Sequence, residues 1–263
     1  VLSFDAETAD NGIYALQGAA VAVNNDTGLV EAIVGGRSQE TSTYTLNRAF
    51  QSFRQPGSSI KPLIVYAPAL EEGYASFSSV KDINVDAAKE PKADVASLPG
   101  NWITLRQAVE KSRNGAAWWL FNEVTPEEGL SYLTQMQFDK IVPDDYNMAA
   151  SLGGFTYGVT AEEMAGAFSA LENGGVYREP DCIVRMENLA GEDIYTGREP
   201  KEVYSQQTAA VMVDVMKGVI SRGTARGMGW KSGIEAAGKT GTTNNSKDGW
   251  FCGMTPYYTV TVW

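Results

Sequence analysis

The chain has 263 residues, of which 43% are hydrophobic, so it carries enough apolar material for a folded core. Its formal net charge is −11 and it contains no basic run, which disfavours nucleic-acid binding because that interaction requires Lys and Arg to neutralise phosphates. It has no histidine, which excludes every Ser-His-Asp triad, Cys-His dyad and histidine-based metal site and leaves Lys, Tyr, Asp or Glu to move protons.

The N-terminal part of the chain predicts a linker followed by a hairpin. Residues 1–17 are polar and acidic, as expected of a linker or entry segment. The apolar runs Ala19–Val23 and Leu29–Val34 flank Asn24–Gly28, whose residues favour turns, and this pattern predicts a β-hairpin. No apolar run in the sequence approaches the ~18 residues that a membrane-spanning helix needs.

A buried helix is predicted from Ser58 to about Glu72. The chain is broken before it by Gln55-Pro56-Gly57, and Gly73 suits a C-cap. Apolar residues occupy every side of this segment, which is typical of a helix in the middle of a domain. Pro68 is expected to bend it.

The middle of the chain predicts a loop and then a series of helices. Tyr74–Trp102 has no clean periodicity and is predicted to be a long loop at the rim of a functional site. Helices are predicted to begin at Thr104, Thr125 and Thr160, because a Gln or Glu follows each threonine three residues later as in a capping box. A further helix is predicted over residues 206–220.

Three strands are predicted at the C-terminal end, over Ala236–Thr243, Trp250–Met254 and Tyr258–Trp263. The order of strands, helices and strands predicts an α+β domain. Its antiparallel sheet of about five strands would be built from both chain ends and flanked by helices, with a mostly helical subdomain inserted. The two cysteines, Cys182 and Cys252, are predicted to be buried free thiols, with a single disulfide as the alternative.

The first candidate for chemistry is Ser58-Ser59-Ile60-Lys61. Three residues apart on a helix, Ser58 and Lys61 share a face and can hydrogen-bond. A serine hydroxyl is a weak nucleophile until a base removes its proton. A lysine in so apolar a helix should have a lowered pKa, which makes Lys61 a candidate base. Taken alone, the pattern is more typical of an ordinary N-cap serine and a lysine that reaches the surface.

Two further motifs lie downstream. Ser112-Arg113-Asn114 would place a hydroxyl and an amide in a loop between helices, where both can reach a cleft. Lys239–Thr243 reads Lys-Thr-Gly-Thr-Thr, which on a strand offers a cation and hydroxyls to a carboxylate, while Gly241 lets a ligand lie alongside. Alone, Ser112-Arg113-Asn114 is more typical of a helix end, and Lys239–Thr243 is more typical of a β-turn or an edge strand.

Together the three motifs stand in an order typical of serine β-lactamases and penicillin-binding proteins. Over about residues 18–263 the chain resembles the transpeptidase domain of class A, bifunctional penicillin-binding proteins. The stretches that carry this resemblance are Ala22–Gly28, Val34–Arg37, Arg54–Pro62, Leu152–Gly154, Tyr157–Thr160, Asn173–Gly175, Ser221–Thr224, Asp248–Phe251 and Thr255–Pro256.

The resemblance implies a D,D-transpeptidase that cross-links peptidoglycan stem peptides through a serine acyl-enzyme, is acylated by β-lactams, and uses no metal or cofactor. It implies that Ser58 is the nucleophile and Lys61 its base. Ser112 would pass a proton to the departing D-alanine, and Asn114 would hold Lys61 and the substrate amide.

The same resemblance implies the binding groups on the last strands. The backbone N–H groups of Ser58 and Thr242 would form the oxyanion hole. Lys239, Thr240 and Thr242 would bind the terminal carboxylate, and Gly241 and Thr243 complete the strand along which a stem peptide or β-lactam lies.

Four alternatives remain open from the residues. A class A β-lactamase should carry a Glu-x-x-Leu-Asn loop, which is absent between Asn114 and Lys239. A D,D-carboxypeptidase differs only in admitting water as the acceptor. A β-lactam sensor would replace Asn114 with an apolar residue, and a scaffold domain should have lost motif residues.

The resemblance also carries expectations about the full-length protein. Class A members have a membrane helix and a glycosyltransferase domain upstream, so the gene is expected to encode both and to place this domain on the outer face of the bacterial cytoplasmic membrane. The chain ends at Trp263, in the expected last strand, before the helix that covers the sheet in such proteins.

Overall fold

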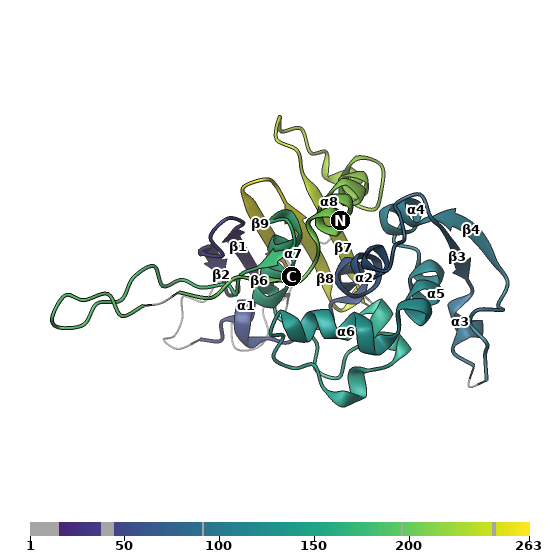
Figure 1. The fold of residues 1–263 in the computed structure, drawn as a ribbon, viewed down its shortest axis with the longest axis horizontal. Coiled ribbons are helices and arrows are strands. Elements are labelled where there is room, and N and C mark those ends of the chain that lie inside the picture. The colour runs from purple at the N-terminus through teal and green to yellow at the C-terminus, as the bar shows by residue number, and fades with distance from the viewer. Residues whose placement is uncertain (1–15, 38–44, 91, 196, 244–245) are drawn as a thin grey trace.

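The strands near the two ends of the chain form one sheet in the computed structural model, which describes residues 16–37, 45–90, 92–195, 197–243 and 246–263 (Figure 1). The sheet is antiparallel throughout, in the order β2-β1-β9-β8-β7. Its strands are β1 (Ala20–Asn24), β2 (Val30–Val34), β7 (Ala237–Thr242), β8 (Gly249–Met254) and β9 (Tyr258–Val262). The predicted α+β fold with a five-stranded sheet from both chain ends is confirmed.

Buried and exposed side chains alternate along the strands, so one face of the sheet packs against helices. In β9, Thr259 and Thr261 are buried whereas Tyr258 and Val260 are exposed. The helices α7 (Ala161–Glu172) and α8 (Gln206–Ser221) pack against the buried face. The period of two along the strand therefore decides which side chains enter the core.

The helical segment that carries Ser58 changes its winding twice. It runs through the 3₁₀ turn η1 (Gly57–Ile60), the π turn η2 (Pro62–Tyr66) and the short helix α2 (Ala67–Glu71). Pro68 has no N–H to donate to the fourth preceding carbonyl. Just before it, the Ala67 N–H donates to the carbonyl of Pro62, five residues back, and not to that of Leu63, four residues back. The carbonyl of Leu63 accepts from the Tyr204 hydroxyl at 2.8 Å. The expected bend is thus a π turn, wrapped entirely in core side chains.

The prediction of a long loop over Tyr74–Trp102 is wrong. The segment contains β3 (Ser79–Ile83) and the short helix α3 (Val85–Ala88), and it ends in β4 (Gly100–Thr104), which pairs with β3. The strand was missed because β3 buries Val80 and Ile83, three residues apart, so it lacks the alternation that marks a half-buried strand.

The remaining elements build the helical part and its connections. The predicted helix starts are confirmed, because Thr104, Thr125 and Thr160 each accept a hydrogen bond from the N–H three residues later. The other elements are α1 (Arg48–Gln51), α4 (Leu105–Glu110), α5 (Asn114–Val124), α6 (Pro126–Gln135), η3 (Pro143–Asp145), η4 (Met148–Leu152), β5 (Val176–Tyr177), β6 (Lys201–Glu202) and η5 (Arg226–Met228).

The two cysteines lie in different surroundings. Both are free thiols, as expected. Cys252 is buried in β8, whereas Cys182 is exposed in the segment between β5 and β6. This segment, residues 178–195 and 197–200, forms an arm that projects from the body of the molecule (Figure 1). The expectation that Cys182 is buried is wrong, because it lies where the chain leaves the core.

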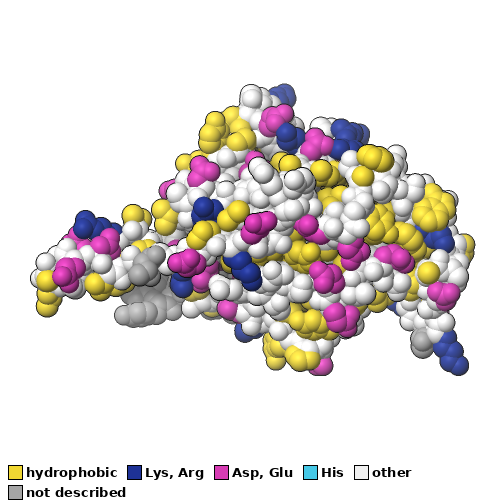
Figure 2. All heavy atoms as spheres, viewed as in Figure 1, with side chains coloured by type: hydrophobic (Ala, Val, Ile, Leu, Met, Phe, Trp, Pro, Cys, Tyr) yellow, Lys and Arg dark blue, Asp and Glu magenta, His cyan; other side chains and the backbone are white. Residues whose placement is uncertain are grey.

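The surface agrees with the acidic composition. Figure 2 shows acidic side chains scattered over one face of the molecule rather than gathered in a single patch. Within the described ranges, no helix is both long enough and apolar enough to cross a membrane.

Candidate active site

Three stretches of backbone meet at Gly57 and place Ser58 beside the sheet. Gly57 has a φ of +53°, and a Cβ there would lie 2.7 Å from the Thr242 carbonyl oxygen. On the other side, a Cβ at Gly153 would lie 2.3 Å from the Gly57 carbonyl oxygen. Only glycine permits both approaches, which bring the start of the Ser58 segment against β7.

Gly241 contributes to the same close packing. A Cβ on Gly241 would lie 2.4 Å from the Pro56 carbonyl oxygen and 2.9 Å from the Ser59 hydroxyl oxygen. The space left by the missing side chain is thus filled by the Ser58 segment, not by a ligand. Glycine is expected at position 241 so that a ligand can lie alongside the strand, whereas in the structure it allows the close approach of Pro56 and Ser59.

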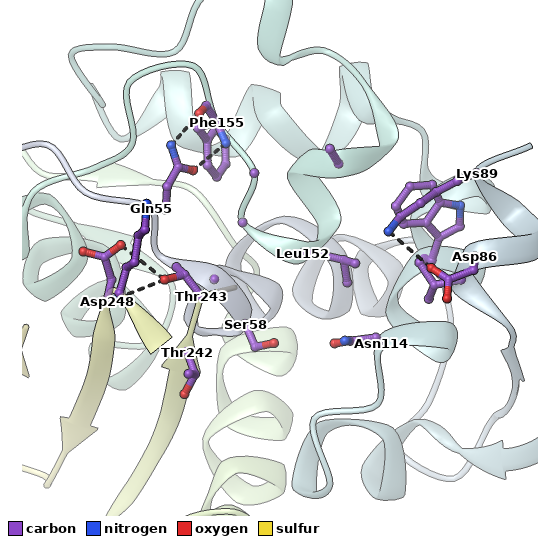
Figure 3. A pocket seen from close by; sticks show the side chains of 17 residues that line it. Gln55, Ser58, Asp86, Lys89, Asn114, Leu152, Phe155, Thr242, Thr243 and Asp248 are labelled. Carbon is purple, nitrogen blue, oxygen red and sulfur yellow. Dashed lines mark hydrogen bonds and ion pairs between the residues drawn. The ribbon is translucent and has the colours of Figure 1, made fainter. Parts of the chain in front are cut away.

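A cleft of about 680 Å³ opens over Ser58. Figure 3 shows Ser58 between Thr242 of β7 and Asn114, the first residue of α5. The rim beyond Asn114 is formed by α3, so the segment predicted to border a functional site does so, although not as a loop. The other lining residues include Gln55, Val85, Asp86, Lys89, Trp118, Leu152, Gly153, Phe155, Thr243 and Asp248.

Lys61 lies fully buried beneath this cleft. Its Nζ donates to the Asn114 Oδ1 at 2.7 Å and to the Ser112 carbonyl oxygen at 3.1 Å. Among the described residues no hydrogen bond joins Ser58 to Lys61, so the contact expected from their spacing is not formed in this state. The loop at Ser112 holds the lysine instead.

Lys239 approaches the same loop from β7. It is also fully buried, and its Nζ donates to the Ser112 hydroxyl oxygen and to the Thr240 carbonyl oxygen, each at 2.8 Å. Ser112 therefore joins the two lysines, through its carbonyl on one side and its hydroxyl on the other. Its φ of +53° lies in the left-handed region, which is unusual for a residue with a side chain.

Burial shifts the pKa of both lysines downward. The pKa of Lys61 is lowered well below its ordinary value, first by burial and then by the charge of Lys239. Burial lowers the pKa of Lys239 to about 7. This environment therefore favours the neutral form of Lys61, which is the form that can accept a proton.

A carboxylate behind the loop acts in the opposite direction. Asp82 of β3 lies nearly buried and accepts from the Arg113 Nε at 2.6 Å. Its negative charge raises the pKa of Lys61, against the effects of burial and of Lys239. Arg113, the middle residue of the second motif, thus pairs with the carboxylate whose charge raises the pKa of Lys61.

Residues outside the three motifs also hold the cleft. The Gln55 side chain bonds both the N–H and the carbonyl of Phe155, at 2.7 and 2.5 Å. The Asp248 carboxylate accepts from the Thr243 hydroxyl at 3.2 Å and from the Trp263 indole N–H at 3.0 Å. Gln55 and Asp248 fall within sequence stretches that carry the family resemblance. The role of Gln55 needed the structure, because Phe155 lies 100 residues later in the chain.

Comparison with known proteins gives a family match over the same region. A family model described as the penicillin binding protein transpeptidase domain matches residues 18–263. Penicillin-binding protein 1F of Bacillus subtilis is 38% identical over a match covering 94% of this chain and 35% of that protein. Penicillin-binding protein 4 of the same organism is 34% identical, covering 94% of this chain and 40% of that protein. The chain thus spans less than half the length of these relatives.

A solved structure shows the same arrangement of elements. Penicillin-Binding Protein 1A from Haemophilus influenzae superposes with a TM-score of 0.76 at 27% sequence identity. The match covers 97% of this chain and 45% of that one. The sheet and the helices around it are therefore shared.

Proposed function

Because the chain belongs to the penicillin-binding-protein transpeptidase family, we propose that it is a serine D,D-transpeptidase that cross-links peptidoglycan stem peptides and is acylated by β-lactams. One observation carries the proposal. Ser58 lines a cleft together with Asn114, which accepts a hydrogen bond from the buried Lys61, and Ser112 joins Lys61 to the buried Lys239. In a chain with no histidine, this cluster supplies the proton-accepting group that a serine nucleophile requires.

The first half-reaction forms an ester on Ser58. Neutral Lys61 accepts the hydroxyl proton as the Ser58 Oγ attacks the carbonyl carbon between the two terminal D-alanines. The N–H groups of Ser58 and Thr242 donate to the oxyanion of the tetrahedral intermediate. The C–N bond then breaks, and the leaving nitrogen takes a proton from the Ser112 hydroxyl.

The hydrogen bonds of Ser112 support its part in this step. Its hydroxyl oxygen accepts from Lys239, so its own proton is free for the leaving nitrogen. A proton from the lysine cluster then restores the hydroxyl. D-Alanine departs with its carboxylate held by Lys239, Thr240 and Thr242.

The second half-reaction transfers the acyl group. The amine of a second stem peptide attacks the ester carbonyl and loses a proton to Lys61, and the C–O bond to Ser58 breaks. The product is the cross-link, and Ser58 regains its proton. A β-lactam keeps its leaving group tethered after the ring opens and stops at the ester stage.

The setting of this activity is part of the same proposal. Since the relatives are more than twice as long as this chain, the domain is proposed to work beside a glycosyltransferase domain. Its substrates lie at the outer face of the bacterial cytoplasmic membrane, and an anchor outside this chain would hold it there.

Intact mass spectrometry with benzylpenicillin tests the proposal. The wild-type protein should gain the mass of one penicillin, and peptide mapping should place it on Ser58. Ser58→Ala should stay unmodified while keeping its circular dichroism spectrum. A label on another residue, or no label on folded wild type, contradicts the proposal.

A further inference from the structure

The hydroxyl of Thr240 has a partner outside the three motifs. The Oγ1 atoms of Thr240 and Thr224 lie 2.7 Å apart, and either can donate. Among the described residues, neither hydroxyl makes another hydrogen bond. Thr224 lies in the turn after α8, separated by 16 residues from Thr240.

The turn that carries Thr224 is tied to the end of α4. The Thr224 N–H donates to the Glu110 carbonyl oxygen at 3.1 Å. The Glu110 carboxylate is buried and accepts from both the Nε and an Nη of Arg222, the former at 2.9 Å. Lys111 adds a third tie, since its Nζ donates to the Arg222 carbonyl oxygen at 2.7 Å.

Two glycines make room for this contact. A Cβ at Gly218 would lie 2.3 Å from the Glu110 Oε1, and one at Gly223 would lie 2.4 Å from the Glu110 carbonyl oxygen. The Glu110 carboxylate and the turn therefore lie in close contact, with no room for a side chain at either glycine. A buried carboxylate with a two-point arginine partner is a well-defined anchor.

This anchor forms a second bridge between the C-terminal end of α4 and β7. The first bridge is the hydrogen bond between Lys239 and Ser112. The second runs from Glu110, two residues before Ser112, through Thr224 to Thr240, next to Lys239. Both bridges therefore join the loop after α4 to β7.

We propose that Thr224 is a positioning residue that sets the Thr240 hydroxyl for the substrate's terminal carboxylate, and that the Glu110–Arg222 pair holds Thr224 in place. The inference rests on the proposed function, because Thr240 binds a carboxylate only if the substrate has one there. A hydroxyl donates one proton. When Thr224 donates to Thr240, the proton of Thr240 is directed to the carboxylate, and the chain of two hydroxyls strengthens that bond.

Acylation by benzylpenicillin and by its methyl ester separates positioning from general stability. Thr224→Val removes the hydroxyl–hydroxyl bond that directs the Thr240 proton, so it should lower the second-order acylation rate with the acid by up to about tenfold, the upper size of one neutral hydrogen bond. The rate with the neutral ester should stay within about twofold of wild type, because no carboxylate is present to use the bond. Thr224→Ser keeps the hydroxyl and should retain the wild-type preference for the acid.

The anchor is tested with a matched pair of variants on the same two helices. Arg222→Lys loses the two-point contact and should reduce the acid-to-ester rate ratio. Arg106→Lys is the control, because Arg106 of α4 pairs with Asp214 of α8 at 2.5 Å but does not contact the turn at Thr224. Its rate ratio should equal that of wild type.

The outcomes separate the inference from the proposed function. An equal loss with acid and ester in Thr224→Val, or no loss with either, overturns the inference while wild-type acylation still supports the function. A changed ratio in Arg106→Lys equal to that in Arg222→Lys overturns the role of the anchor. Folded wild type that acylates with neither compound contradicts the proposed function and removes the inference with it.

Discussion

Lys239 donates a hydrogen bond from its Nζ to the hydroxyl oxygen of Ser112 at 2.8 Å. The backbone carbonyl of the same serine accepts from Lys61. Ser112 therefore bonds both lysines at once. A substitution can remove its hydroxyl, which accepts from Lys239, while its backbone carbonyl, which accepts from Lys61, remains. This separation makes it the most informative position for mutagenesis.

Two replacements of Ser112 should have the same effect on acylation but different effects on the stability of the fold. Both Ser112→Ala and Ser112→Gly remove the proton donor to the leaving nitrogen, so both should slow acylation by about 10²–10⁴-fold. Because the φ of +53° suits glycine, Ser112→Gly should be about 1 kcal/mol more stable to unfolding than Ser112→Ala. Penicillin labelling and urea unfolding measure the two effects. Near wild-type acylation in either variant would remove Ser112 from the proton path.

Lys61→Arg tests the identity of the base. Arginine keeps a positive charge but does not give up its proton in a protein, so it cannot accept one from Ser58. Acylation should fall by about 10²–10⁴-fold. The variant is compared with Lys140→Arg, a lysine outside the cleft that stacks over Phe53, which should acylate normally. Equal rates for both variants would assign the base to another group.

The pH dependence of acylation should move with the charge of Asp82. A general base works only when deprotonated, so the rate should rise with pH until Lys61 is neutral. Burial and Lys239 lower the pKa of Lys61, whereas Asp82 raises it. Asp82→Asn removes the charge that favours the protonated form, so the pKa should fall further and the rising limb should move to lower pH. A limb that stays in place, or moves upward, contradicts this assignment.

Much of this domain could be predicted from the sequence, because its signals are local. The hairpin near the N-terminus and the caps at Thr104 and Thr160 depend on neighbouring residues, and the structure confirms them. The stretch Ser221–Thr224 carries part of the family resemblance, but the sequence does not indicate what it does. That role depends on the contact with Glu110, more than a hundred residues earlier, and no periodicity encodes such a distance.

The wrong predictions of a long loop over Tyr74–Trp102 and of a buried Cys182 have a common physical origin. The strand β3 packs against α5 and buries Val80 and Ile83, which are three residues apart, so its burial does not alternate. Its Asp82 carboxylate pairs with Arg113 beside Ser112. Cysteine is usually a buried residue, but Cys182 is exposed near the start of the arm between β5 and β6. In both places the surroundings, which are built from distant segments, override the preference of the residue itself.

The two thiols should react at very different rates. Cys182 is exposed, whereas Cys252 is fully buried and its pKa is raised to about 12 by burial. Because the thiolate is the reactive form, a thiol reagent should modify only Cys182 in the folded protein and both residues after denaturation. Cys182→Ser should leave no fast-reacting thiol. Two fast-reacting thiols in the native state would contradict the packing around Cys252.

The penicilloyl adduct on Ser58 should persist, because neither carboxylate among the described residues that line the cleft is set to act as a base for water. Hydrolysis of the ester needs a group that deprotonates water on the side away from the leaving group. The carboxylates that line the cleft in the described part of the chain are Asp86 and Asp248. Asp86 pairs loosely with Lys89 on the rim at 3.6 Å, and Asp248 is held by Thr243 and Trp263.

A missing base of this kind slows a reaction by about 10²–10⁴-fold, so the adduct should survive for minutes to hours. The measurement is a mass spectrum time course after excess penicillin is removed, run beside a serine β-lactamase as the fast-clearing control. Rapid return to the unmodified mass, with steady turnover of a chromogenic cephalosporin, would make the protein a β-lactamase. A stable adduct together with release of D-alanine from a stem-peptide mimic fits a transpeptidase or carboxypeptidase, and adding an acceptor amine distinguishes these two, because only the transpeptidase forms the cross-linked product.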